Sequence, residues 1–368
     1  MTDSIIPETI FSISFILEKL GISTCCLENL EKYESREIAK GLGFFSKIIK
    51  ITFYWKDSIL LPKSIVLKIP VANGYTDHLE YAFQRELNFY QIFGKFNIKV
   101  PKFYYGYPFH RHHNHGIMIL EDLSTSGCNP RMLPGLTNEQ VEAVIDELAK
   151  INVISWQNHG WYESFIEDAD QAEFLTDMYG YALDIIKIQP EAFENLVPRT
   201  KSIYTYETYK KVQYTEDKYG FPPSIVHSDL WAPNIIFEKD ENGNPTSNLL
   251  TIIDWQNAHP GNPCEDITRL LFANTTGEYR RSNTQRLLKF YKERVEFYNN
   301  NKALFTLDQL LEAYKASLGY TLAFFSFGVP HYHDMENVVD GTYPGEYKEE
   351  LLNRVRMCSE DVIQEYGL

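Results

Sequence analysis

Residues 227–234 read His227-Ser228-Asp229-Leu230-Trp231-Ala232-Pro233-Asn234 and lie between two short apolar stretches, 224–226 and 235–237. Short apolar runs bounded by polar residues predict strands. A loop held between two strands fixes Asp229 and Asn234 five residues apart, so a carboxylate can face a substrate hydroxyl while an amide oxygen faces a metal ion. We therefore take Asp229 as the candidate catalytic base and Asn234 as a candidate metal ligand.

A second apolar strand ends in an acid at Thr251-Ile252-Ile253-Asp254. Its carboxylate is the candidate second metal ligand, because oxygen donors suit Mg²⁺. The spacing His-x-Asp-x-x-x-x-Asn is only moderately informative by itself, and an Asx-type turn is the alternative. The spacing becomes informative because the other parts of a kinase site occur upstream of it in the expected order.

The first of these parts is a turn between two strand-like stretches that carries Gly41, Gly43 and Ser46. Glycines on such a turn let the backbone approach phosphates closely. Ser46 stands where a third glycine would lie in a protein-kinase loop. The alternative is an ordinary hairpin with glycines at its turn. We expect Gly41 to Ser46 to cover the phosphates of a nucleotide.

Lys68 and Glu86 form the second part. Lys68 lies inside the apolar stretch 61–70, where a cation needs an anionic partner to offset its desolvation. Glu86 lies in segment 80–93, whose apolar positions recur at the three- and four-residue spacing of a helix. A lone Glu on a helix is usually solvated. Paired with Lys68, it can instead hold the ammonium against the α and β phosphates.

The stretch 117–123 predicts a hinge between two lobes, because an apolar strand runs there into acids and then into a Ser124-Thr125-Ser126-Gly127 turn. An adenine ring could hydrogen-bond to backbone groups near Glu121 and Leu123. An ordinary strand end is the alternative.

Together these segments resemble the ecdysteroid-kinase-like branch of the choline-kinase and aminoglycoside-phosphotransferase superfamily, including a large nematode group of kinase-like proteins. The resemblance spans most of the chain. The Leu-Trp after Asp229 and the Trp-Gln after Asp254 favour this branch over protein kinases, which carry Phe-Gly after the metal-binding Asp. The other marks are Gly43-Phe44-Phe45-Ser46-Lys47, Leu61-Pro62-Lys63-Ser64, Arg85-Glu86, Glu121-Asp122-Leu123-Ser124 and Gly261-Asn262-Pro263-Cys264-Glu265-Asp266.

The resemblance implies an α+β, bilobal, protein-kinase-like fold with the nucleotide in the cleft between the lobes. Residues 1–122 would form an N-lobe of five antiparallel strands and one helix, and 123–368 a larger, mainly helical C-lobe. It also implies that Asp266 and Arg269 support the catalytic loop from beneath. Asn152 stands where relatives often carry a His. We expect this difference to affect the packing around residue 152 and not the chemistry of the site.

Other segments bear on the fold. Residues 11–20 predict an amphipathic helix on the first lobe, and the Thr137-to-Gln140 spacing predicts a capping box that opens a helix to about Trp156. Residues 160–220 look mostly helical. The histidines His110, His112, His113 and His115 could bind zinc, although a solvated hairpin tip is the better interpretation.

Most of an aromatic run near the C-terminus predicts core, and a minority of it could line an acceptor pocket. The run comprises Tyr314, Tyr320, Phe324, Phe325, Phe327, His331, Tyr332 and His333.

Composition limits the classes of partner and the cellular location that we expect for this chain. The chain has 368 residues, 44% of them apolar, which suffices for a packed core. A net charge of −15 argues against nucleic acid as a partner. No apolar run approaches the roughly 20 residues that span a bilayer. Five scattered cysteines without metal-type spacing predict reduced thiols in a cytoplasmic protein, and no obligate protein partner is evident.

The sequence therefore predicts an ATP- and Mg²⁺-dependent kinase that phosphorylates a hydroxyl group of a small molecule. By family analogy alone, the acceptor is a steroid-like or other lipophilic alcohol. Choline-type or aminoglycoside-type acceptors are the first alternative. A catalytically silent nucleotide-binding protein is the second. His227 is expected to anchor the loop by hydrogen bonds.

Overall fold

The computed structural model describes residues 4–22, 28–38, 46–56, 61–71, 76–110, 112, 115–165, 171–339 and 344–368. The chain divides into two compact units, Met1–Ser126 and Gly127–Leu368. The predicted boundary after Asp122 lies four residues before this division.

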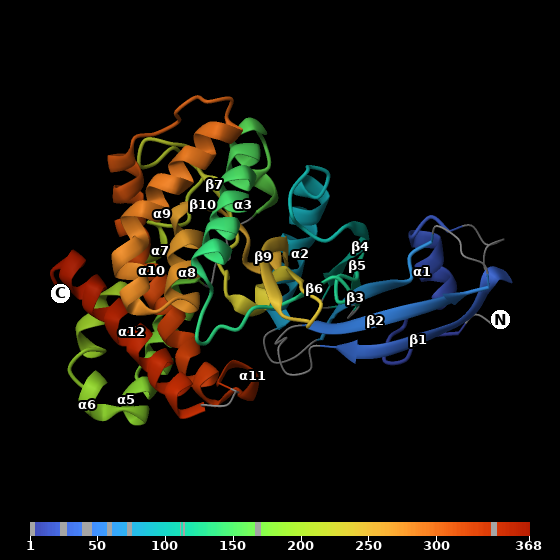
Figure 1. The fold of residues 1–368 in the computed structure, drawn as a ribbon, viewed down its shortest axis with the longest axis horizontal. Helices are drawn as coiled ribbons and strands as arrows, with labels where there is room; N and C mark the ends of the chain where they lie inside the picture. The colour runs from blue at the N-terminus through green and yellow to red at the C-terminus, as the bar shows by residue number, and fades with distance from the viewer. Residues whose placement is uncertain are drawn as a thin grey trace. The chain divides into compact units, whose positions relative to one another are not determined.

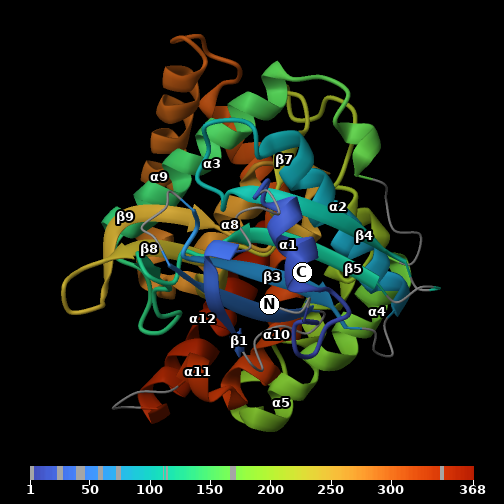
Figure 2. The same ribbon diagram turned by 90° about the vertical axis from the view of Figure 1, so that its right-hand side faces the viewer.

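The first unit is built on a five-stranded antiparallel sheet with the order β1-β2-β3-β5-β4 (Figures 1 and 2). The predicted five-stranded sheet is thus confirmed. Within the described part of this unit two α-helices accompany the sheet, and one of them confirms the helix predicted over 11–20. The elements are α1 (Ile13–Lys19), β1 (Leu30–Ile38), β2 (Ser46–Trp55), β3 (Ser64–Pro70), α2 (Thr76–Phe93), β4 (Phe103–His110) and β5 (His115–Glu121).

Strand alternation gives the sheet two different faces. One face packs with α1 into an apolar core that includes Ile16, Ile51 and Leu67. The other face carries Lys68, which in register lies opposite Ile48 of β2 and Met118 of β5. Helix α2 supplies the partner of Lys68 on this side. The sheet therefore separates an apolar layer from a layer that carries charge.

The second unit is mainly helical (Figure 1). Its α-helices are α3 (Asn138–Gln157), α4 (Gln171–Ala182), α5 (Asp184–Ile188), α6 (Pro190–Phe193), α7 (Tyr206–Tyr209), α8 (Cys264–Asn274), α9 (Gly277–Tyr298), α10 (Leu307–Asp334), α11 (Glu336–Val339) and α12 (Pro344–Tyr366). The predicted capping box opens α3: the Gln140 N–H donates to the Thr137 hydroxyl, and the Thr137 N–H donates to the Gln140 side chain. Residues 171–220 form only short helices joined by turns.

Two small sheets hold the loops of interest. The first pairs β7 (Ser224–Val226) with β10 (His259–Gly261), and the second has the order β6-β8-β9. The strands of the second are β6 (Gly127–Cys128), β8 (Ile235–Lys239) and β9 (Pro245–Ile252). Thus the 227–234 loop lies between two strands, as predicted. Among the described residues, no helix is long and apolar enough to cross a membrane.

Candidate active site

Lys68 and Glu86 form the predicted buried ion pair. Lys68 Nζ lies 2.5 Å from Glu86 Oε2, and the residues are 7% and 1% exposed. The β strand places the ammonium on the charged face of the sheet, and α2 brings the carboxylate to it. Burial of both charges makes the geometry well defined but costs desolvation. The pairing is confirmed, and its role with phosphates stays a prediction.

The predicted glycine turn is only partly within the described residues. Gly41 and Gly43 lie outside them. Ser46 is the first residue of β2, where it pairs in register with Pro70.

The predicted hinge follows β5 directly. The Glu121 N–H donates to the Lys102 carbonyl at 2.9 Å, and the Leu123 carbonyl accepts from the Ser126 N–H at 3.1 Å. The Glu121 carbonyl and the Leu123 N–H are the complementary pair of groups that an adenine edge would need. Contact with adenine stays a prediction.

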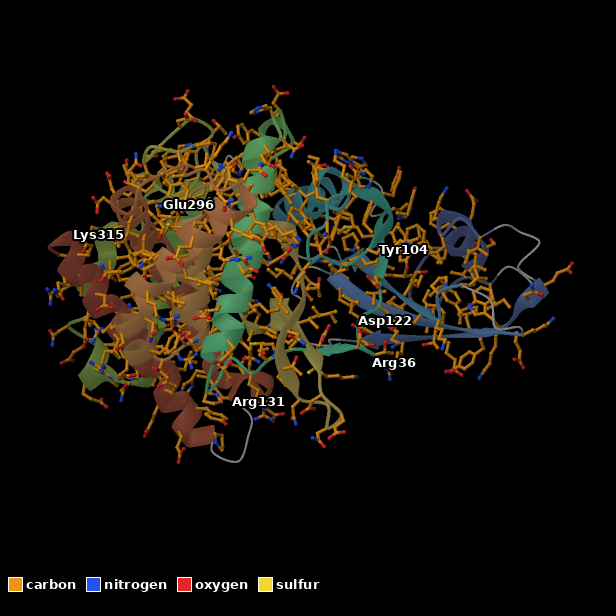
Figure 3. The ribbon with its side chains drawn as sticks, turned by 45° about the horizontal axis from the view of Figure 1, so that its top comes forward. Arg36, Tyr104, Asp122, Arg131, Glu296 and Lys315 are labelled. Carbon is orange, nitrogen blue, oxygen red and sulfur yellow. The ribbon has the colours of Figure 1, made fainter. Side chains whose placement is uncertain are left out.

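A second buried ion pair holds this segment, and the sequence analysis missed it. Lys50 Nζ on β2 lies 2.7 Å from Asp122 Oδ2, and the Ser64 hydroxyl donates to the same oxygen at 2.6 Å (Asp122 is labelled in Figure 3). The Asp122 side chain is only 1% exposed. Burial acts to raise its pKa, but hydrogen bonds from Lys50, Ser64 and Ser124 outweigh it and lower the pKa to about 2. The position of Lys50 within an apolar strand could have indicated a buried anionic partner, as the position of Lys68 did.

In the second unit, Asp266 of α8 anchors the backbone of the catalytic loop. Its two carboxylate oxygens each accept one N–H, from His227 and from Ser228, at 2.8 Å. Burial raises the pKa of Asp266 to about 7, against the opposing effect of these hydrogen bonds. The supporting role implied by the family resemblance is confirmed.

His227 anchors the loop from its other side. Its Nδ1 accepts the Asp229 N–H at 3.2 Å, so the ring proton is on Nε2, which donates to the Ile253 carbonyl at 2.9 Å. A ring used in this way has no site left for proton transfer. The expected anchoring role of His227 is confirmed.

The carboxylate of Asp229 is held by two side chains. Arg269 Nη2 donates to Oδ1 at 3.0 Å, and Asn234 Nδ2 lies 3.4 Å from Oδ2 and donates to the Asp229 backbone carbonyl at 2.9 Å. Arg269 is 1% exposed, while the Asp229 side chain is 16% exposed. Asp229 thus stays partly exposed to solvent while a buried cation holds its Oδ1. The direct contact between Arg269 and Asp229 was not foreseen.

The candidate metal ligands lie at one end of the β8–β9 pair. Asn234 immediately precedes β8, and Asp254 follows two residues after the end of β9, whose Ile252 pairs with Ile235. The Ile253 N–H donates to the Asn234 carbonyl at 2.9 Å, which joins the two loops. Asp254 itself has a left-handed backbone, with φ of +67°.

This donor set fits Mg²⁺. The site offers only one carboxylate and one amide oxygen. This small number suits Mg²⁺, because Mg²⁺ typically binds one or two protein oxygens and completes its coordination with water and substrate phosphates. Among the described residues there is no group of three or more His, Cys, Asp or Glu side chains suited to a metal. His110 pairs with Glu80 at 3.2 Å, and His113 lies outside the described residues, so the zinc alternative gains no support.

Asn152 of α3 has a packing role. Its Nδ2 donates to the Ile225 carbonyl of β7 at 3.0 Å, and its Oδ1 accepts from the buried Tyr291 hydroxyl at 2.7 Å. It therefore braces the strand that leads into the catalytic loop.

Half of the C-terminal aromatic run is buried in the core. Its buried members are Tyr314, Tyr320, Phe325 and Tyr332. Phe324 and Phe327 are half-buried. Tyr332 stacks on Trp231 with ring centroids 4.9 Å apart, and its hydroxyl oxygen accepts a hydrogen bond from Arg269 Nη2 at 3.3 Å. Aromatic faces therefore adjoin the residue that holds Asp229.

The chain is similar in sequence to a family of known proteins. A family model described as DUF1679, uncharacterized oxidoreductase dhs-27, matches residues 71–367. The chain is similar to an uncharacterized kinase-like protein of Caenorhabditis elegans, 26% identical over 262 residues, which cover 68% of this chain and 66% of that protein. It is also similar to the uncharacterized oxidoreductase dhs-27 of C. elegans, 25% identical over 304 residues, covering 74% of this chain and 36% of that protein.

Among solved structures, the choline kinase of Cryptosporidium parvum has the same fold, with a TM-score of 0.54 at 14% identity, covering 95% of this chain and 96% of that one. The kinase-like fold is thereby confirmed.

Proposed function

We propose a function from the premise that this chain belongs to the DUF1679 family and has a kinase-like fold: it is an ATP- and Mg²⁺-dependent kinase that phosphorylates a hydroxyl group of a small molecule. The observation that carries the proposal is the anchored loop, in which Asp229 stays partly exposed, Asn234 Nδ2 bonds to its backbone carbonyl, and the Ile253 N–H beside Asp254 bonds to the Asn234 carbonyl. We further propose the ecdysteroid-kinase-like branch, supported by the Leu-Trp after Asp229, and a cytoplasmic location.

The roles follow from the contacts. The partly exposed Asp229 carboxylate would accept the hydrogen of the acceptor hydroxyl, while Arg269 keeps the side chain in place. Asn234 and Asp254 would hold Mg²⁺, which when bound neutralises phosphate charge. Lys68, oriented by Glu86, would contact the phosphates. The turn that contains Gly41 and Gly43 would cover them.

A steroid-like or other lipophilic alcohol is the acceptor we propose. The half-buried faces of Phe324 and Phe327 suit a flat apolar molecule. Aromatic faces also suit a quaternary ammonium, which keeps a choline-type acceptor as the alternative. The C. elegans relative called an oxidoreductase is matched over 36% of its length, so the activity in its name does not extend to this chain.

The test is transfer of labelled phosphate from ATP across a panel of steroids, choline-like amines, aminoglycosides and simple alcohols. The control is Asp229→Asn, because an amide oxygen can still accept from Arg269 and so keeps that buried cation paired. A labelled product that the control fails to make would support the proposal and name the acceptor class. Magnesium-dependent ATP binding without any product would favour the catalytically silent alternative.

A further inference from the structure

A chain of three buried polar side chains lies beneath the catalytic loop. The Ser228 hydroxyl donates to Glu265 Oε1 at 2.5 Å, and Glu265 Oε2 lies 3.1 Å from His259 Nε2. These residues are 5%, 1% and 3% exposed. None of the roles assigned above uses Glu265 or His259.

The chain connects the two loops that carry the candidate site. Ser228 immediately precedes Asp229, and Glu265 is the second residue of α8. His259 opens β10, and its Nδ1 bonds to the Asn257 carbonyl at 3.0 Å, in the turn that follows Asp254. One set of hydrogen bonds therefore extends from the residue before the base to the turn after the candidate metal ligand.

Hydrogen-bond chemistry fixes where one proton lies. A backbone carbonyl only accepts, so His259 Nδ1 carries a hydrogen toward Asn257. The contact between His259 Nε2 and Glu265 Oε2 then requires a second proton, carried either by the imidazolium or by the carboxyl group. Glu265 Oε1 accepts the Ser228 hydroxyl in both cases. The directions of the Ser228 and Asn257 hydrogen bonds are therefore fixed.

The backbone conformation of Ser228 shows why these hydrogen bonds matter for the loop. Ser228 has φ of +68°, a left-handed conformation that a residue other than glycine adopts at a cost and that needs support from its surroundings. Asp266 holds the backbone N–H of Ser228, and Glu265 holds its side chain. Both contacts come from adjacent residues of α8.

We infer that Glu265 and His259 are positioning residues for Asp229, which they orient by holding the Ser228 hydroxyl. This inference rests on the proposed kinase function. The two residues would set the orientation of the Asp229 carboxylate. Their loss should therefore lower turnover more than nucleotide affinity. Because one buried hydrogen bond that fixes the loop is lost, removal of this contact should lower kcat about 10-fold.

The experiment compares Ser228→Ala, Glu265→Ala and Glu265→Gln in the full chain. Glutamine can satisfy both neighbours, since its amide oxygen accepts from Ser228 and its amide N–H donates to a neutral His259. We expect Ser228→Ala and Glu265→Ala to lower kcat about 10-fold with the KM for ATP changed less than about twofold, and Glu265→Gln to stay within about threefold of wild type. The double variant Ser228→Ala/Glu265→Ala should be no worse than Glu265→Ala.

Amide hydrogen exchange of the 227–231 segment is the second measurement, and it needs no acceptor. Glu265→Ala should speed exchange there about 10-fold, while Glu265→Gln should not. Equal loss of kcat in the Ala and Gln variants, or wild-type kcat in Ser228→Ala, would overturn the inference. If wild type shows no phosphate transfer, the kinase proposal fails, and unchanged exchange in Glu265→Ala would separately overturn the positioning role.

Discussion

The ion pair between Lys68 and Glu86 allows a test that separates stability from function. Lys68 and Glu86 are 7% and 1% exposed, and their charged atoms lie 2.5 Å apart. Removing one partner of such a pair leaves an uncompensated buried charge and typically costs about 3–5 kcal/mol. Replacing both partners by apolar side chains of similar size is often neutral or stabilising.

We therefore expect Glu86→Leu to lower the stability of the first unit by about 3–5 kcal/mol. The double variant Lys68→Met/Glu86→Leu should recover most of this loss but should no longer bind ATP in the presence of magnesium. Lys63→Met is the matched control, because Lys63 lies in the same stretch 61–70 but is exposed.

Hydrogen exchange of the β3 and α2 peptides in increasing urea measures the stability of this unit without assuming that the whole chain unfolds in one step. Calorimetric titration measures ATP binding. If the double variant were as unstable as Glu86→Leu, the buried-charge argument would be refuted. If it bound ATP with wild-type affinity, Lys68 would lose its proposed role.

Three further predictions concern the remaining site residues. Asp229→Asn should lower turnover at least about 100-fold with ATP affinity nearly unchanged, in steady-state kinetics, and comparable turnover would remove the base role. Asp254→Ala should abolish the magnesium dependence of ATP binding in a thermal-shift assay, with the exposed Glu241→Ala as control, and a retained dependence would contradict the assignment. The pKa of Asp122 is about 2 in the folded chain against the ordinary 3.8, so its contribution of about 2 kcal/mol is present above pH 4 and lost as the pH falls towards 2. Asp122→Asn should flatten this part of the stability profile in urea unfolding between pH 2 and pH 6, and an unchanged slope would refute the assignment.

The sequence predicts a contact well when the two partners lie close together along the chain. A Lys within an apolar strand needs an anion, and a helix eighteen residues later offered Glu86. The same reasoning applies to Lys50, but its partner Asp122 lies seventy-two residues away in an irregular segment, where no periodicity indicates which side chain turns inward.

Contacts made through tertiary packing could not be derived in this way. The spacing within residues 227–234 predicted the loop and its two strands. That Arg269 reaches Asp229 depends on how α8 packs beneath the loop. Glu265 shows the same limit, since an acid at the start of a helix is usually solvated. Nothing local marks it as the partner of Ser228.

The left-handed backbones of Ser228 and Asp254 have a consequence for directed evolution of this protein. Both residues have φ near +68°, where glycine is relaxed and other side chains are strained. A library screened only for thermal tolerance should therefore enrich glycine at position 254, by relief of about 1 kcal/mol, whereas at position 228 the loss of the hydroxyl bound by the buried Glu265 offsets the same relief. The glycine variant at 254 would lose the carboxylate proposed for Mg²⁺. Heat-resistant clones with glycine there would be expected to lack catalysis.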